Sequence, residues 1–222
     1  MTVFDAITLD WGVRDKKKSG DPSLRSPGLA FELVKRAIDL GGALFALLLL
    51  GPILLGCGLW IRWADGGPVF YRQWRVGRDG KLFRIWKLRT MRVNAEAGGA
   101  QFAQDNDPRV IRGCRWIRKS HLDELPQLLN IIRGEMTLVG PRPERPELME
   151  QMAVELPGLH RRLLGTPGLT GLAQVRNGYT NDLAGMQRKL DLDLQYLRER
   201  SIWLDLRLIA QTLPHFWDRH AC

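Results

Sequence analysis

The sequence predicts an α+β fold that is mostly helical, with a small β-hairpin sheet and an N-terminal re-entrant membrane helix broken at Gly51-Pro52. Three observations predict this class. Residues 40–61 carry no charge, two aromatic-rich segments flank a glycine-containing connector, and later segments place apolar residues at helical spacing. We expect a poorly ordered tail over residues 1–30, the membrane helix over 31–61, and a cytosolic domain over 62–222 that ends in an amphipathic helix.

Composition narrows the class of protein and of partner. The 222 residues are 45% apolar, which suffices for one compact core. Three cysteines without a CxxC spacing and four histidines without HExxH argue against a disulfide framework and a zinc site, so we expect a reduced protein facing the cytosol. The net charge of +9 predicts an anionic partner, which could be nucleic acid, anionic lipid or a phosphorylated small molecule.

The apolar run is long enough for a membrane. As one straight helix, residues 40–61 would span about 33 Å, roughly the hydrocarbon thickness of a bilayer. Pro52 lies at the centre, where its ring removes a backbone donor and bends a helix, so each half reaches about half of that depth. Lys and Arg flank the run on both sides and favour the cytosolic side. We therefore interpret it as a re-entrant hairpin; a single kinked span and a buried helix of a soluble protein are the alternatives.

The other elements follow from local patterns. Apolar residues between Trp203 and Trp217 recur at helical spacing, and this amphipathic helix either packs on the core or lies in the membrane interface. The remaining predicted elements are a β-hairpin from Val69–Val76 and Lys81–Leu88, a loop over residues 94–107, a short basic helix over 108–119, and a turn or tight loop over 166–171.

An adjacent pair of carboxylates, Asp123 and Glu124, opens a predicted helix. The apolar residues that follow have helical spacing, Gly134 closes the helix, and Pro126 is tolerated only near the first turn, so the helix should begin close to Leu122. The pair then lies at the positive end of the helix, an end that also binds phosphate. An ordinary capping role for the two carboxylates is the alternative reading.

Arginines and a lysine near these carboxylates are candidate phosphate ligands. Prolines on both sides of Arg142 hold the backbone extended and suit it to bidentate phosphate binding, although a plain Pro-rich connector fits the same pattern. Arg118 precedes the carboxylate pair, and Lys87 and Arg89 end the predicted hairpin. Neither GxGxxG nor GxxxxGK[ST] occurs, so nucleotide binding would not use those loops.

Taken together, these segments resemble the bacterial sugar transferase family, small monotopic phosphoglycosyl transferases that start glycoconjugate assembly on polyprenol phosphate. Singly each motif is weak, but they occur in the order of the family. The matching segments are Lys35-Arg36 before a proline-broken membrane helix, Lys87-Leu-Arg-Thr-Met91, Leu122-Asp-Glu-Leu-Pro-Gln127, Gly140-Pro-Arg-Pro143, Pro167-Gly-Leu-Thr-Gly171 and Trp203-Leu-Asp205.

The resemblance implies that the cytosolic domain is catalytic, with Asp123 as nucleophile and Asp123 and Glu124 at a Mg²⁺ ion. It further implies substrate or phosphate contacts at Arg118, Arg142, Lys87, Arg89 and Arg145. Two departures stand out. The family often has a serine where Gly51 stands, and a small hydroxyl residue where His121 stands, which weakens the expected helix cap.

The implied reaction moves a sugar-1-phosphate from a UDP-sugar to polyprenol phosphate, as the first step of exopolysaccharide assembly. We expect a ping-pong mechanism through a phosphoryl-aspartate on Asp123, which at its ordinary pKa of about 3.9 is ionised at pH 7 and needs no base. The implied location is the cytosolic face of the bacterial inner membrane. The implied partners are the two substrates and the membrane, with no nucleic acid; a homo-oligomer is compatible with this reading. A silent basic membrane-surface adaptor and a direct ternary-complex transferase are the alternatives.

Overall fold

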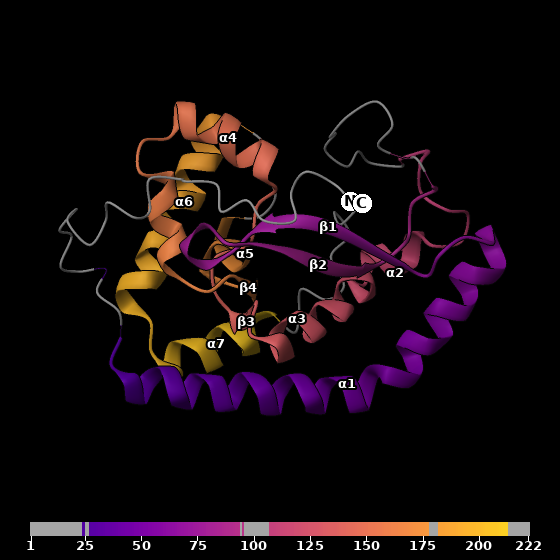
Figure 1. Cartoon of the computed structure of the whole chain (residues 1–222), viewed down its shortest axis with the longest axis horizontal. Helices are drawn as coiled ribbons and strands as arrows, with labels where there is room; N and C mark the ends of the chain where they lie inside the picture. The colour runs from indigo at the N-terminus through magenta and orange to yellow at the C-terminus, as the bar shows by residue number, and fades with distance from the viewer. Residues whose placement is uncertain (1–23, 25–26, 94, 96–106, 178–181, 213–222) are drawn as a thin grey trace.

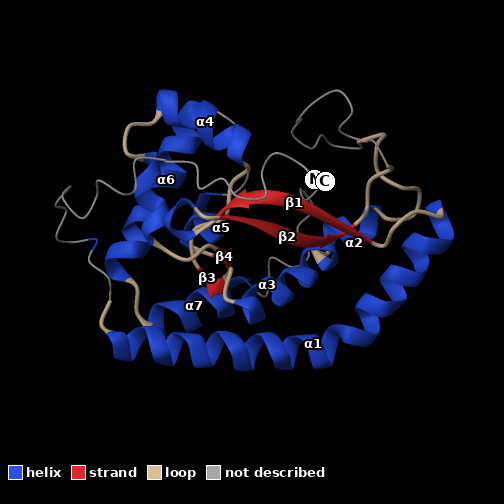
Figure 2. Cartoon of the chain, viewed as in Figure 1, coloured by secondary structure: helices blue, strands red, loops and turns tan. Residues whose placement is uncertain are grey.

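The computed structural model describes residues 24, 27–93, 95, 107–177 and 182–212 (Figure 1). The tail expected over residues 1–30 and the loop expected over 94–107 lie almost wholly outside these residues. In chain order the elements are α1 (Leu29–Asp65), β1 (Phe70–Val76), η3 (Arg78–Gly80), β2 (Leu82–Leu88), α2 (Arg115–Lys119), η4 (Leu122–Gln127), α3 (Leu128–Arg133), β3 (Thr137–Val139), α4 (Pro146–Glu155), η5 (Leu159–Leu164), β4 (Gly168–Thr170), α5 (Leu172–Asn177), α6 (Leu183–Glu199) and α7 (Ile202–Thr212). The predicted class is confirmed: helices dominate and the sheets are small (Figure 2).

The long helix α1 continues through Pro52, so the expected break is a bend. It has 37 residues, begins two residues before the predicted boundary and ends four after it. Figure 1 shows one limb running beneath α7 and α3 and a second limb rising beyond a bend. The ring of Pro52 accounts for a bend within the helix, because it removes one backbone hydrogen bond and crowds the preceding turn. Gly66, left-handed with φ 68°, ends the helix by donating its N–H to the carbonyl of Arg62.

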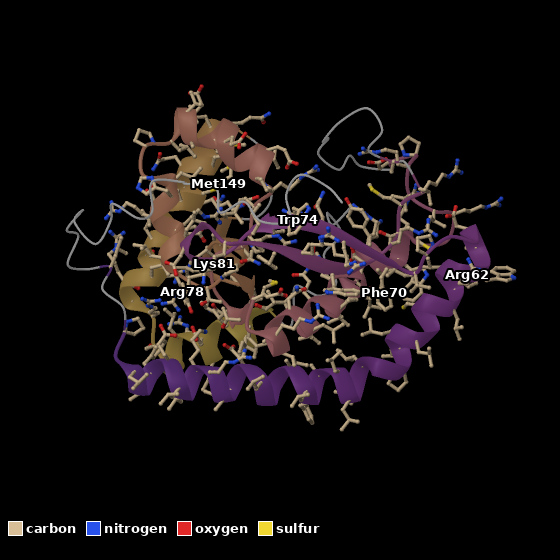
Figure 3. The ribbon with its side chains drawn as sticks, in the orientation of Figure 1. Arg62, Phe70, Trp74, Arg78, Lys81 and Met149 are labelled. Carbon is tan, nitrogen blue, oxygen red and sulfur yellow. The ribbon has the colours of Figure 1, made fainter. Side chains whose placement is uncertain are left out.

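By length and composition, α1 is a candidate membrane segment. Only 17% of its most apolar stretch is buried inside the protein. Figure 3 shows side chains of the first limb directed away from the rest of the molecule. The exposed apolar residues include Leu44, Phe45, Leu48, Leu49, Leu55, Leu59 and Trp63. Re-entry of this helix into the cytosolic leaflet stays a prediction, with a single kinked span as the alternative.

One turn of α1 is fastened to the domain by polar groups. Lys35 donates to the carbonyl of Val139 at 3.1 Å and to Asp205 at 2.6 Å. One turn later, Asp39 accepts from the hydroxyl of Thr137 at 2.6 Å and from a backbone N–H of β3 at 2.9 Å. Between them, Arg36 donates to two carbonyls at the end of α3. We call these residues the α1 clasp: Lys35, Arg36, Asp39, Thr137, Val139, Tyr196 and Asp205.

The β-hairpin forms as predicted. β1 and β2 pair antiparallel, from Phe70 opposite Leu88 to Val76 opposite Leu82. The connector includes Asp79 in the left-handed region at φ 56°, which lets the chain reverse tightly. Because side chains alternate along a strand, Arg75 and Lys87 share one face of the hairpin.

A second sheet replaces the turn expected over residues 166–171. β3 and β4 pair parallel, with Thr137 opposite Gly168 and Val139 opposite Thr170. The backbones approach so closely that a Cβ on Gly168 would lie 2.1 Å from the nitrogen of Gly140. Only glycine fits there, so the two glycine- and proline-bearing motifs form one unit.

The C-terminal amphipathic helix does not simply bury its apolar residues and expose its charged ones. In α7, Asp205 and Leu208 are buried against the core, whereas Trp203 and Leu206 are exposed. Its inward face thus packs on the domain, and the outward face keeps a tryptophan in solvent. Residues after Thr212 lie outside the described part of the chain.

Candidate active site

The segment that carries Asp123 and Glu124 begins where the sequence predicts, at Leu122, but its first turns are tighter than an α-helix. Residues 122–127 form a 3₁₀ helix, and the α-helix α3 follows from Leu128 to Arg133 and ends at left-handed Gly134. His121 precedes it with a φ of 53° and makes no side-chain cap, as its identity predicted. The two carboxylates therefore lie in the first turn of a short 3₁₀ segment.

This segment rests on the candidate membrane helix. Leu122 and Leu125 flank the two carboxylates and belong to the apolar clusters that include Leu50 and Leu54 of α1. Those two α1 residues stand on either side of Pro52 in the sequence. The carboxylate pair is thus held next to the proline-bearing middle of α1.

Glu124 is held as a carboxylate by two cations. Its Oε1 atom accepts from Lys87 Nζ at 2.7 Å and also from the guanidinium of Arg142. Burial alone would raise the pKa of Glu124, but Arg142 and Lys87 outweigh it and hold that pKa well below the ordinary value. Burial in turn lowers the pKa of Lys87, and Glu124 opposes that shift.

Asp123 has a different environment. Asp123 is buried, with 8% of its surface exposed. Burial, and then the neighbouring charge of Glu124, raises the pKa of Asp123 to about 6, while Lys87 and Arg118 act in the opposite direction. The expectation of an ordinary pKa is therefore corrected: Asp123 is still mainly ionised at pH 7, but it titrates close to neutrality.

The backbone around Arg142 is fixed by four donors from three elements. The carbonyls of residues 141–144 accept hydrogen bonds in turn from Gly168 of β4, Arg162 of η5, Arg75 of β1 and Val76 of β1, at 2.8 to 3.1 Å. Two of these four residues are prolines and have no N–H of their own, so their positions depend on these donors. The restricted backbone predicted on both sides of Arg142 is thus held in place by these donors. We call residues 141–144 the clamped segment.

A buried ion network lies behind that segment. Arg162 pairs with Asp193 of α6 at 2.6 Å and lies 3.5 Å from Glu144, which also binds Lys189. Burial would raise the pKa of Glu144, but Lys189 and Arg162 lower it to about 2. The network links the backbone of Arg142 to α6 through these ion pairs.

The remaining predicted ligands differ in their surroundings. Arg118 lies near enough to Asp123 to lower its pKa, and it donates to the hydroxyl of Thr90 at 3.3 Å. Arg89 is buried in contacts with Asp65, the carbonyl of Pro68 and the carbonyl of Met91. It therefore secures the end of α1; its Nη2 has no hydrogen-bond partner among the described residues, and its predicted phosphate contact stays a prediction.

Arg145 precedes α4 and lies 3.5 Å from Glu147 of the same helix. It is one of the cations whose charge acts on Arg75. It thus borders the clamped segment, whereas Lys87 and Arg142 contact Glu124 directly.

Sequence reasoning missed Arg75, Arg162 and Gln127. Arg75 could have been found, because it shares the period-2 face of the hairpin with Lys87. Arg162 is brought to the site only by long-range folding, and no local signal marks it. Gln127 is completely buried, and neither end of its amide has a hydrogen-bond partner in the described part of the chain.

Two buried donors near the carboxylates are similarly without partners. Within the described residues, this holds for Nε of Arg75 and Nε of Arg118. A buried donor without a partner is destabilising, and such groups are rare in folded proteins. Their concentration around a raised-pKa carboxylate is typical of a site completed by an anionic ligand.

Asp123 and Glu124 also form a candidate metal site. Within residues the structure describes, no group of three or more His, Cys, Asp or Glu side chains gathers for a metal ion. Mg²⁺ needs fewer, because it commonly takes one or two carboxylates and fills its other positions with water and substrate phosphates. Asp123 and Oε2 of Glu124 fit that pattern, since the two cations both bind Oε1.

Comparison with known proteins finds a matching family model and several similar proteins. A family model described as "Bacterial sugar transferase" matches residues 30–219. Over 190 residues the chain is 41% identical to the UDP-N-acetylgalactosamine-undecaprenyl-phosphate N-acetylgalactosaminephosphotransferase of Aeromonas hydrophila, covering 86% of this chain and 44% of the relative.

Two further relatives carry a different sugar in their names. The chain is 39% identical over 183 residues to the UDP-glucose:undecaprenyl-phosphate glucose-1-phosphate transferase of Escherichia coli K12, covering 82% of this chain and 39% of that protein. It is 40% identical over 190 residues to the Caulobacter vibrioides protein of the same name, covering 85% and 71%. The chain thus spans about two fifths of the length of the first two relatives.

Proposed function

Since the chain belongs to the bacterial sugar transferase family, we propose that it transfers a sugar-1-phosphate from a UDP-sugar to polyprenol phosphate, yielding polyprenyl diphosphosugar and UMP. One observation carries the proposal. Asp123, with a pKa raised to about 6, lies beside Glu124, which binds Lys87 and Arg142, and its flanking leucines share an apolar cluster with Leu50 and Leu54 of α1. This arrangement offers a nucleophile and phosphate-binding cations at a candidate membrane helix.

The nucleophile is the carboxylate of Asp123. An oxygen of Asp123 forms a bond to the β-phosphorus of the UDP-sugar, the bond from that phosphorus to the bridging oxygen breaks, and UMP leaves. The sugar-phosphoryl aspartate then reacts with a phosphate oxygen of polyprenol phosphate. That oxygen forms the new diphosphate bond, and the carboxylate of Asp123 is restored.

The cations oppose the repulsion between a carboxylate and a diphosphate. Arg142 and Lys87 keep Glu124 ionised, and Arg118 acts on Asp123. Donors that have no partner in the described residues, such as Nε of Arg118, are available to phosphate oxygens. Fixed positive groups in a buried site stabilise developing negative charge more strongly than the same groups in water.

Mg²⁺ fits the carboxylate pair, with Asp123 and Oε2 of Glu124 as the residues that would hold it. When bound, it would neutralise oxygens of the diphosphate. The role of Glu124 in this proposal is to hold that charge in place, oriented through Oε1 by Lys87 and Arg142.

The proposed location is the cytosolic face of the bacterial inner membrane, with α1 as a re-entrant anchor. The exposed apolar face of α1 supports it, as does the apolar cluster that Leu50 and Leu54 share with Leu122 and Leu125. A two-step transfer suits this position, because one site can take a soluble donor first and a lipid acceptor afterwards.

A burst experiment tests the proposal. Purified protein is mixed with a panel of UDP-sugars and Mg²⁺ without lipid acceptor, and UMP is measured. We expect one UMP per active enzyme with the correct donor and none with Asp123→Asn. UMP release only when polyprenol phosphate is present would favour a direct ternary-complex transfer, and no release under either condition would favour a silent adaptor.

A further inference from the structure

A patch of arginine and aromatic side chains lies on the β-hairpin and the end of α3, outside the site described above. Arg72 lies 4.8 Å from the centroid of the Trp86 ring, and Arg133 lies 5.4 Å from it. Phe70 packs edge-on against the same ring at 5.7 Å. A second stack, 4.5 Å apart, joins Arg84 to Trp74. We call these residues the guanidinium–aromatic patch.

Two exposed guanidinium groups at one ring form a site for an anion. Arg72 comes from β1 and Arg133 from the last turn of α3, and neither forms an ion pair with the residues that the structure describes. Stacking on tryptophan uses the flat face of a guanidinium and leaves its N–H edge for bidentate binding of phosphate. A phosphate bound at either guanidinium would also weaken the repulsion between the two positive charges at this ring.

The Phe70 end of the patch adjoins the second limb of α1. Val69, next to Phe70, packs so closely on that limb that a Cβ on Gly58 would lie 3.0 Å from it. The pairing partner of Phe70 is Leu88, which belongs to the same apolar cluster as Cys57 and Ile61 of α1. Figure 3 shows Phe70 at the end of the hairpin that lies toward the rising limb.

That limb also exposes apolar side chains. Leu55, Leu59 and Trp63 are 66%, 64% and 78% exposed. An apolar helix face that ends in an exposed tryptophan is typical of a segment passing from acyl chains to head-group depth. The phosphates nearest to the patch would then be those of the bilayer.

From these observations we propose that the guanidinium–aromatic patch binds the phosphates of anionic phospholipid head groups, through Arg72 and Arg133 stacked on Trp86. The proposal rests on the membrane position of α1 within the proposed function, but not on the reaction itself. An anchoring helix alone leaves the domain able to roll about the helix axis. A second contact at the hairpin fixes that rotation, and with it the direction in which Lys87, on the other face of the hairpin, presents the catalytic site.

Lipid selectivity tests the proposal. The full chain is reconstituted in phosphatidylcholine bilayers, and the binding of spin-labelled phosphatidylglycerol is compared with that of spin-labelled phosphatidylcholine by electron spin resonance. We expect a preference of about threefold for phosphatidylglycerol at low salt, which falls toward one as salt screens the charges. The double variant R72Q/R133Q should lose the preference and keep its melting temperature.

A matched control removes the same charge elsewhere. Arg188 and Arg198 are exposed on α6, so R188Q/R198Q should keep the preference. The proposal is overturned if the wild type shows no preference, if both double variants lose it equally, or if saturating UDP-sugar or a short oligonucleotide abolishes it. Lipid binding is measured without turnover, so its result is independent of the UMP burst.

Discussion

The α1 clasp and the candidate active site both contain buried carboxylates and cations, but they differ in how completely the carboxylate oxygens are paired. In the α1 clasp, both carboxylate oxygens of Asp39 and of Asp205 accept a hydrogen bond, from Thr137 and Leu138 and from Lys35 and Tyr196. At the candidate active site, two cations share one oxygen of Glu124, and Asp123 forms no ion pair with the described residues. Complete pairing marks a joint, whereas incomplete pairing marks the place where a ligand is expected.

The largest expected effect comes from removing the charge of Asp123. Asp123→Asn should lower UMP release by at least about 1,000-fold, because the amide is a poor nucleophile. Stability at pH 7 should be unchanged or raised by about 1 kcal/mol, since a buried carboxylate whose folded-state pKa lies above its unfolded value destabilises the ionised protein. UMP release and urea unfolding, measured on the same preparation, check both statements. A variant that is inactive because it unfolds would break the comparison.

The clasp should respond in the opposite way. Asp205→Ala leaves Lys35 without its buried counter-ion, and leaves Lys35 and Tyr196 with the carbonyl of Val139 as their remaining shared acceptor, so we expect a loss of about 3 kcal/mol in the free energy of unfolding. The folded fraction should still release UMP at a near-normal rate. Asp191→Ala on the exposed face of α6 serves as the control and should be nearly neutral. Equal stability of Asp205→Ala and the wild type would contradict the assignment of the clasp as a joint.

A smaller effect is expected at Arg142. Arg142→Lys keeps the charge but loses the planar fork that reaches Glu124, and we expect kcat/KM for the UDP-sugar to fall about 100-fold. Because the backbone of residues 141–144 is held by other donors, the melting temperature should change little. Arg188→Lys provides the matched control. Unchanged kcat/KM in Arg142→Lys would remove Arg142 from the site.

The smallest expected effect is a shift in pH dependence. With the pKa of Asp123 at about 6, UMP release should fall as pH drops through 6, because the protonated carboxyl is no nucleophile. Arg118 lowers that pKa, so Arg118→Met should move the acid limb to higher pH. Rates measured from pH 5 to 8 check this. A limb that stays in place would show that Arg118 does not act on Asp123.

Local patterns predicted the elements that depend on neighbouring residues. Two aromatic-rich segments around a glycine-containing connector indicated the hairpin, and Pro126 and Gly134 indicated where the carboxylate-bearing segment begins and ends. The adjacency of Asp123 and Glu124 is itself local, so the centre of the site could be read from the sequence. The same patterns gave no distinction between a 3₁₀ turn and an α-helical turn.

Long-range pairing could not be read in this way. The parallel partner of β4 is β3, about thirty residues earlier, so the strand looked like a turn. Arg162 and Asp193 reach Arg142 through the packing of α6 and η5, and Asp205 was expected on a solvent-facing side of its helix. The raised pKa of Asp123 also depends on burial, which only the folded structure provides.

The measurement that tests the central claim most directly is the mass of the protein after mixing with its UDP-sugar and Mg²⁺, with no lipid acceptor and rapid acid quenching. We expect a gain equal to one sugar phosphate, located by peptide fragmentation on Asp123 and lost when polyprenol phosphate is added before the quench. An unchanged mass in an enzyme that makes UMP only with the acceptor present, or a modified residue other than Asp123, would contradict the account.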